Sequence, residues 1–126
     1  MMRGNLRKEG LLMLARRKVY LAIPYSDSDP RVREERFRLA NQMAARLLGQ
    51  GFNVWSPISH SHPISLYMNN SNDSSFWCEN SLAFLEHCDE LFVYCIPRWR
   101  DSEGVAREIE FAEKHQISIV YWGRDE

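Results

Sequence analysis

One acidic side chain, Glu108, has sequence neighbours that suit chemistry on a charged ligand. It belongs to residues 101–112, DSEGVAREIEFA, a run of helical period that follows an apolar, strand-like segment. Ser102 and Gly104 open this predicted helix, where free N–H groups and the positive dipole end attract an anion. Because glycine has no side chain, a ligand can approach the backbone closely there. The motif therefore predicts a phosphate site at Ser102 and Gly104.

Glu108 borders the apolar face of the predicted helix, since it lies beside Ile109 and three residues after Val105. We expect it at the floor of a crevice. A carboxylate in that place can attack a sugar carbon or stabilise an oxocarbenium ion. The alternative is a surface glutamate that pairs with Arg107 or Lys114.

Three residues near the first predicted strand are further candidates. Tyr25 and Ser26 follow that strand directly, and the Tyr25 hydroxyl can orient a catalytic carboxylate or a sugar oxygen. The alternative is a turn tyrosine that packs over the sheet. Arg36 lies about two turns into the next predicted helix and faces either a phosphate or solvent.

The segment after the second predicted strand carries His60 and His62, and near its end Asp73 and Trp77. No third ligand is spaced with the two histidines, so we expect substrate or lid contacts, or a plain loop, and no metal site. Trp77 either stacks on a nucleobase or packs in the core. Asp73 is a candidate substrate-binding residue.

The elements that must position these residues alternate between strands and helices. Asp29 followed by Pro30 is a helix start, with a capping acceptor and a proline at the first helical position. Residues 58–75 show no sustained periodicity, which predicts a long functional loop. The predicted strands are residues 18–23, 52–55, 90–96 and 117–122, and the predicted helices are residues 31–48, 76–88 and 102–115.

This alternation predicts an α/β fold, an open parallel sheet of four to five strands with helices on both faces. Ligands of such sheets bind beyond the carboxyl ends of the strands. Here those ends are residues 23–29, 55–61 and 96–102, which hold or adjoin the candidate residues.

Composition and charge exclude several classes of protein. The 126 residues, 44% apolar and 26% charged, are typical of one globular domain, and a net charge of -1 gives no footprint for a nucleic-acid polymer. Residues 1–17 are predicted to form a basic extension, and the domain is assigned to residues 18–126. The apolar run at residues 11–15 is too short for a secretory signal or a membrane span. Three cysteines without a CxxC pair favour a cytoplasmic protein without a disulfide framework.

Three segments resemble a small family of phages and bacteria that is similar to the nucleoside 2-deoxyribosyltransferases and the 2′-deoxynucleoside 5′-monophosphate N-glycosidases. They are YLAIPYS, which runs from the first predicted strand into the loop after it, and SPISHSHPI and WRDSEGVAREIEFA, which follow the second and third predicted strands. The third is the specific one, because Ser-x-Gly-Val-x-x-Glu matches at residues 102, 104, 105 and 108. The resemblance covers residues 18–122.

The resemblance implies a flavodoxin-like fold, usually dimeric, that acts on a small nucleotide or nucleoside without a cofactor. It implies that Glu108 is the nucleophile that attacks C1′ of the sugar, and that Ser102 and Gly104 contact a 5′-phosphate. Tyr25 resembles the residue near the sugar and the nucleophile. Water or a second base then releases the sugar with retained stereochemistry.

The chain departs from the superfamily at one position. Members have an aspartate eight residues before the residue that corresponds to Asp89, and this chain has Ser81 there. The acid step then falls to Asp73, Glu79 or a histidine of the long loop. Two alternatives stay open: a nucleotide-binding or nucleotide-sequestering module without catalysis, and a partner-binding protein with this fold.

Overall fold

The computed structural model describes residues 17–68 and 74–123, and within these ranges four strands form one parallel sheet. The strands lie in the order β2-β1-β3-β4. Their bounds are β1 (Lys18–Ala22), β2 (Asn53–Trp55), β3 (Glu90–Tyr94) and β4 (Ser118–Trp122). The predicted α/β class is confirmed. The order of the strands is the flavodoxin-like order, in which the direction of winding reverses between β1 and β3.

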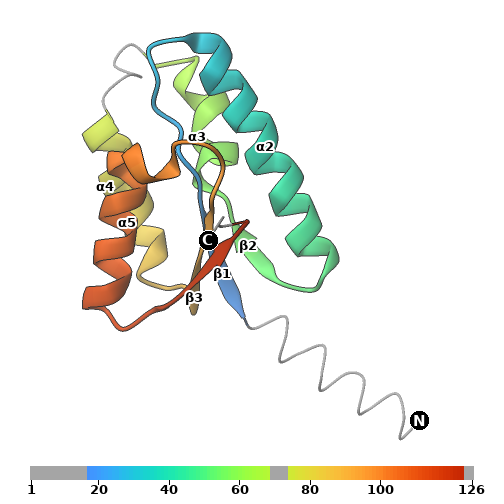
Figure 1. Ribbon diagram of the computed structural model, residues 1–126, viewed down its shortest axis with the longest axis vertical. Helices are drawn as coiled ribbons and strands as arrows, with labels where there is room; N and C mark the ends of the chain where they lie inside the picture. Colours follow the sequence, from blue (N-terminus) through green and yellow to red (C-terminus); the bar gives the residue numbers. More distant parts are fainter. Residues whose placement is uncertain (1–16, 69–73, 124–126) are drawn as a thin grey trace, which may run out of the picture.

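Helices cover both faces of this sheet, as the alternation of elements predicted. Helix α2 lies on one face, and helices α4 and α5 lie on the other (Figure 1). The described helices are α2 (Pro30–Gly49), α3 (Pro57–Ser65), α4 (Ser74–Leu85), α5 (Glu103–Lys114) and the short 3-10 helix η1 (Trp99–Asp101).

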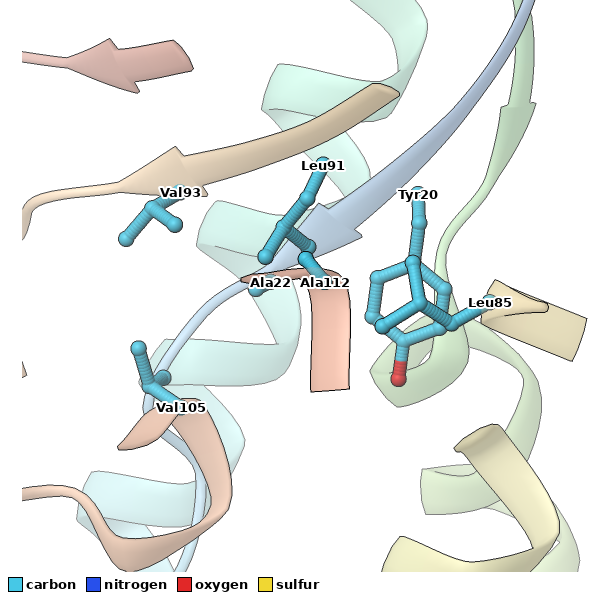
Figure 2. Packing of buried hydrophobic residues seen from close by; sticks show 7 residues of the cluster. All are labelled: Tyr20, Ala22, Leu85, Leu91, Val93, Val105 and Ala112. Carbon is cyan, nitrogen blue, oxygen red and sulfur yellow. The ribbon is translucent and has the colours of Figure 1, made fainter. Parts of the chain in front are cut away.

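The two faces have separate apolar cores because side chains alternate along a strand. Val19 and Leu21 of β1 pack with Leu47 of α2. On the other face Tyr20 packs with residues of α4 and α5, and Figure 2 shows its hydroxyl directed away from β1. That cluster consists of Tyr20, Ala22, Leu85, Leu91, Val93, Val105 and Ala112.

Local sequence signals place the starts of the two helices that adjoin the carboxyl edge of the sheet. The Asp29 side chain accepts a hydrogen bond from the Arg31 amide, with Pro30 in the first turn of α2. Ser102 caps α5 in the same way, at 3.2 Å from the Val105 amide. Each cap satisfies a backbone donor that the helix leaves unpaired, so both predicted starts are confirmed.

The predicted long loop at residues 58–75 is wrong over its first part, where α3 forms. Pro57 occupies the first turn of α3 without losing a helical hydrogen bond, and Ser56 precedes it. Ile58 and His62, four residues apart, are both buried and give the helix an inward face. Pro63, serines and histidines masked this pattern in the sequence. Residues 69–73 of the same prediction lie outside the described residues.

No helix in the described part of the chain is long and apolar enough to cross a membrane. Residues 1–16, nearly all of the predicted basic extension, lie outside the described residues. The boundary between this extension and the domain, at residue 18, stays a prediction.

Candidate functional site

A cavity of about 640 Å³ opens at the carboxyl edge of the sheet. Residues that follow β1 and residues that follow β3 line it together, which places it at the reversal point of the strand order. Helices α3 and α4 supply further walls. The lining residues used below are Ile23, Tyr25, Ser26, Asp27, Arg33, Pro57, Ile58, Trp77, Cys78, Ser81, Asp101, Ser102, Glu103, Gly104, Arg107 and Glu108.

Glu108 lies in the wall of this cavity and is only 8% exposed. Burial raises the pKa of its carboxyl group from the usual 4.5 to about 8, because the charged form loses its water. A hydrogen bond from the Tyr20 hydroxyl acts in the opposite direction and lowers that pKa. The expected surface alternative, in which Glu108 pairs with a neighbouring lysine or arginine in solvent, does not describe this buried side chain.

Tyr20 is the functional neighbour that the sequence analysis missed. Its side chain is fully buried in β1, and its hydroxyl binds Oε2 of Glu108 and also contacts the Ser81 hydroxyl. A buried tyrosine needs a partner for its hydroxyl, so a tyrosine in an otherwise apolar strand was the available signal. Burial and the adjacent Glu108 carboxyl raise the pKa of Tyr20, which therefore stays a hydrogen-bond donor.

Tyr25 lines the cavity, but its hydroxyl does not hold the Glu108 carboxyl as one reading of the sequence expected. It lies 2.6 Å from Nδ1 of His62 instead. Because side chains alternate along β1, Tyr20 points to the α4–α5 face, where Glu108 lies, and Tyr25 lies beyond the strand end. Burial raises the pKa of Tyr25, and the nearby Arg33 guanidinium lowers it in part.

The predicted phosphate residues Ser102 and Gly104 both line the cavity at the start of α5. The Ser102 oxygen accepts from the Val105 amide, which leaves its hydroxyl hydrogen to donate. A Cβ added to Gly104 would meet the Ser102 Oγ at 3.8 Å, an ordinary contact. The protein itself therefore does not require glycine at this position, which is consistent with a space kept for a ligand.

Of the two arginines Arg33 and Arg36 on α2, Arg33 lines the cavity and the predicted Arg36 does not. Arg36 donates to the Ser26 carbonyl at 3.0 Å and does not line the cavity. Arg33 lies one turn closer to the start of α2, lines the cavity and donates to the Asp27 carbonyl. Since α2 begins at the carboxyl edge and runs away from it, the earlier residue is the one that reaches the cavity. Ser26 lines the cavity as expected.

The two histidines have different environments, and neither lines the cavity. His62 is buried between α2 and α3, and His60 is exposed, with its ring 5.1 Å from the Trp55 ring. Trp77 lines the cavity and is partly buried. Asp73 lies outside the described residues. No group of three histidine, cysteine or acidic side chains in the described ranges could hold a metal ion.

Two more polar side chains of the wall come from α4. Ser81 is buried, and the Cys78 thiol contacts the Arg107 side chain and lies near the Glu108 carboxyl. Burial raises the pKa of the Cys78 thiol, so it stays protonated near neutral pH. The sequence carried no signal for Cys78 or Arg107, because their role depends on how α4 packs on α5.

The charges around the cavity are mixed. Among the described residues, four carboxyl side chains and two guanidinium groups, those of Arg33 and Arg107, line it. Two of the carboxyl groups, those of Asp101 and Glu103, flank Ser102 at the start of α5. An anionic ligand at this place would therefore depend on the free N–H groups of the helix and on the two arginines to offset these carboxylates.

Comparison with known proteins identifies a family and no activity. The family described as "Domain of unknown function (DUF1937)" matches residues 17–124. No curated protein matches the chain.

Proposed function

The chain belongs to the DUF1937 family, whose description names no activity, and we propose that it cleaves or transfers the N-glycosidic bond of a nucleoside 5′-monophosphate or nucleoside. The observation that carries the proposal is the Glu108 carboxyl group. It is buried in the wall of the cavity, held by the Tyr20 hydroxyl, and lies one and a half turns from an anion-attracting helix start.

Two displacements at C1′ describe the reaction. The deprotonated Glu108 carboxylate attacks C1′ as the base leaves, and a glycosyl ester forms. Water, or a second base, then attacks C1′ from the opposite side, so the configuration is retained. Tyr20 positions the carboxylate, because its hydrogen bond fixes one oxygen and leaves the other for the sugar.

The walls of the cavity suit the three parts of a nucleotide. Pro57, Ile58 and Trp77 line the cavity and offer apolar and aromatic surface to a base. The start of α5, with Ser102 and Gly104, supplies N–H and O–H donors for a 5′-phosphate. Glu108, further along α5, then meets the sugar between them.

The test is base release, measured by chromatography over a panel of nucleosides and nucleoside 5′-monophosphates. We expect release from at least one of them, lost by a factor of about 1,000 or more in Glu108→Gln, which keeps the size of the side chain but cannot attack. Glu103→Gln is the matched control, because Glu103 also lines the cavity on α5 but is exposed. Unchanged release in Glu108→Gln would remove this residue from the mechanism.

A nucleotide-binding module without catalysis is the second candidate. It is favoured by Ser81, whose hydroxyl stands in the wall where an acid is expected in the superfamily that the sequence resembles. Calorimetric binding of a nucleotide with no product after long incubation would support this candidate over the enzyme.

Three predictions complete the proposal: a cytoplasmic location, a homodimer, and a reaction that needs neither a metal nor a cofactor.

A further inference from the structure

A row of three polar side chains leads away from the cavity through Tyr25. The Tyr25 hydroxyl lies 2.6 Å from Nδ1 of His62, and Nε2 of His62 lies 3.1 Å from Oε1 of Glu34. His62 is 8% exposed, while the Glu34 side chain is 61% exposed. The row therefore connects a group in the cavity wall, through a buried imidazole, to a carboxylate in contact with water.

The imidazole of His62 is held in one orientation. The Phe37 ring stacks on it with 4.2 Å between ring centroids and 24° between the planes. The Ser65 hydroxyl donates to the His62 carbonyl at 2.7 Å and so ties the backbone of the same turn. Both ring nitrogens have partners, so the ring cannot turn over without losing two hydrogen bonds.

The protonation state of His62 decides what the Tyr25 hydroxyl offers to the cavity. With neutral His62, Nε2–H donates to Glu34 and Nδ1 accepts from Tyr25, so the tyrosine oxygen presents lone pairs. With the imidazolium form, both nitrogens donate, and the Tyr25 O–H is released to donate into the cavity. In that form Nε2–H still donates to Oε1 of Glu34, 3.1 Å away.

The proposed glycosidic chemistry needs such a group, since a departing base must receive a proton. A serine hydroxyl such as that of Ser81 is not an acid near neutral pH. Tyr25 packs against the apolar cluster that contains Ile23 and Ile58, which also line the cavity. It therefore lies on the side that the proposed function assigns to the base.

We propose that Tyr25 is the proton donor to the leaving base, with His62 and Glu34 as the positioning residues that supply and recover its proton. The inference rests on the proposed function and adds the acid–base residue to it. The substrates that depend on this row are nucleotides whose bases leave only after protonation.

The protons and electron pairs balance in both steps. As the C1′–N bond breaks, its electron pair goes to the base nitrogen, and Glu108 bonds to C1′. The Tyr25 proton passes to the base, and Nδ1–H of His62 replaces it, which leaves His62 neutral. In the second step water attacks C1′ and Glu108 regains its electron pair. The water proton passes to Tyr25, whose own proton returns to His62.

The charged groups around Tyr25 are consistent with a brief loss of its proton. Arg33 and Glu34 of α2 both act on the hydroxyl, and Ser65 of α3 contacts it. Burial raises the pKa of Tyr25 most strongly, so the phenol is protonated between turnovers, while Arg33 stabilises the transient phenolate.

The experiment compares two forms of the nucleotide that the protein cleaves fastest. One form is unmodified. In the other the base is N-methylated to a cation, at N7 of a purine or N3 of cytosine, so that it leaves without a proton. The rate of base release is measured within the first turnover, so that it reports the first step alone. In Tyr25→Phe this rate is expected to fall about 100-fold or more with the unmodified nucleotide and less than about threefold with the cation. Glu34→Gln changes an exposed carboxyl group. It is expected to slow base release from the unmodified nucleotide by a smaller factor, and again to leave release from the cation nearly unchanged.

Tyr67→Phe is the control, because Tyr67 is 91% exposed and does not line the cavity. Equal losses on both substrates in Tyr25→Phe, or no loss on either, would overturn the role of Tyr25 and leave the proposed function standing. No release from either substrate by the unsubstituted protein would instead reject the proposed function, and the role of Tyr25 with it.

Discussion

At the scale of single residues, the site is defined by a carboxyl group taken out of water. The pKa of Glu108 is about 8, so at neutral pH most of the unliganded protein holds this group protonated. A nucleophile must be deprotonated, whereas an acid must hold its proton. The pH dependence of the reaction therefore distinguishes the two roles of Glu108.

We expect kcat/KM for the N-methylated substrate to rise about tenfold per pH unit below pH 8 and to level off above it. This substrate leaves without a proton, so the profile reports the nucleophile alone. Initial rates from pH 5.5 to 9.5 give the measurement. A profile that is flat at low pH and falls above pH 8 would assign Glu108 the role of an acid.

The same pKa makes a prediction about stability. The pKa of Glu108 is higher in the folded protein than in the unfolded chain. The stability that the protonated carboxyl group contributes is therefore fully present below about pH 4.5 and is lost as the pH rises through about 8. The full loss is about 4 to 5 kcal/mol at about 1.4 kcal/mol per pH unit. Glu108→Gln has no proton to lose, so its free energy of unfolding should exceed that of the unsubstituted protein at pH 9.

Urea unfolding of both proteins at pH 5 and pH 9 measures this difference. Glu103→Gln, at the exposed carboxyl on the same helix, should show no such gain at pH 9. If Glu108→Gln gained nothing relative to the unsubstituted protein between the two pH values, the raised pKa of Glu108 would be wrong.

At the scale of elements, the start of α5 combines a cap, a glycine and an approach for an anion. Gly104→Ala should raise the free energy of unfolding by about 0.5 to 1 kcal/mol, since alanine favours a helix and its Cβ meets only an ordinary contact. It should also weaken binding of the nucleoside 5′-monophosphate by about tenfold or more, because the methyl group occupies the phosphate approach. Binding of the nucleoside should change little.

Calorimetry and thermal unfolding of one preparation test both parts of this prediction. Gly49→Ala is the matched control, because Gly49 also has an open surrounding but lies at the end of α2. Gly104→Ala with unchanged affinity for the 5′-monophosphate would remove the phosphate from the start of α5.

Elements with strong local signals could be predicted, and elements that depend on packing could not. The continuous apolar run of β3 and the Ser102 cap of α5 led directly to the elements that hold Glu108. Helix α3 was missed because its buried residues are only Pro57, Ile58 and His62, among polar residues and a second proline. Tyr20 was missed because an aromatic residue in an apolar strand reads as core until its hydroxyl partner is known.

At the scale of the whole molecule, the reversal between β1 and β3 brings the two predicted motifs to one cavity. That meeting follows from the strand order, which the alternation of elements alone does not determine. The choice of Arg33 over Arg36 and the row from Tyr25 to Glu34 depend on the position of α2 against α3, for which the sequence has no local signal.

A nucleotide that binds in the cavity of the folded protein stabilises the fold against unfolding. A nucleotide present at 100 times its dissociation constant should stabilise the fold by about 2.7 kcal/mol and raise the melting temperature by about 10 °C. The panel of nucleosides and 5′-monophosphates provides the measurement. A melting temperature unchanged across the whole panel would favour a partner-binding protein over both the enzyme and the nucleotide-binding module.

The most direct test of the central claim is to trap the ester between Glu108 and the sugar. Protein mixed with an excess of the cleaved nucleotide is quenched in acid within the first turnover, and its peptides are examined by mass spectrometry. We expect a sugar phosphate adduct, or a sugar adduct from a nucleoside, on the peptide that contains Glu108, and none in Glu108→Gln. Steady base release with no adduct on that peptide, together with inverted configuration at C1′, would contradict the account.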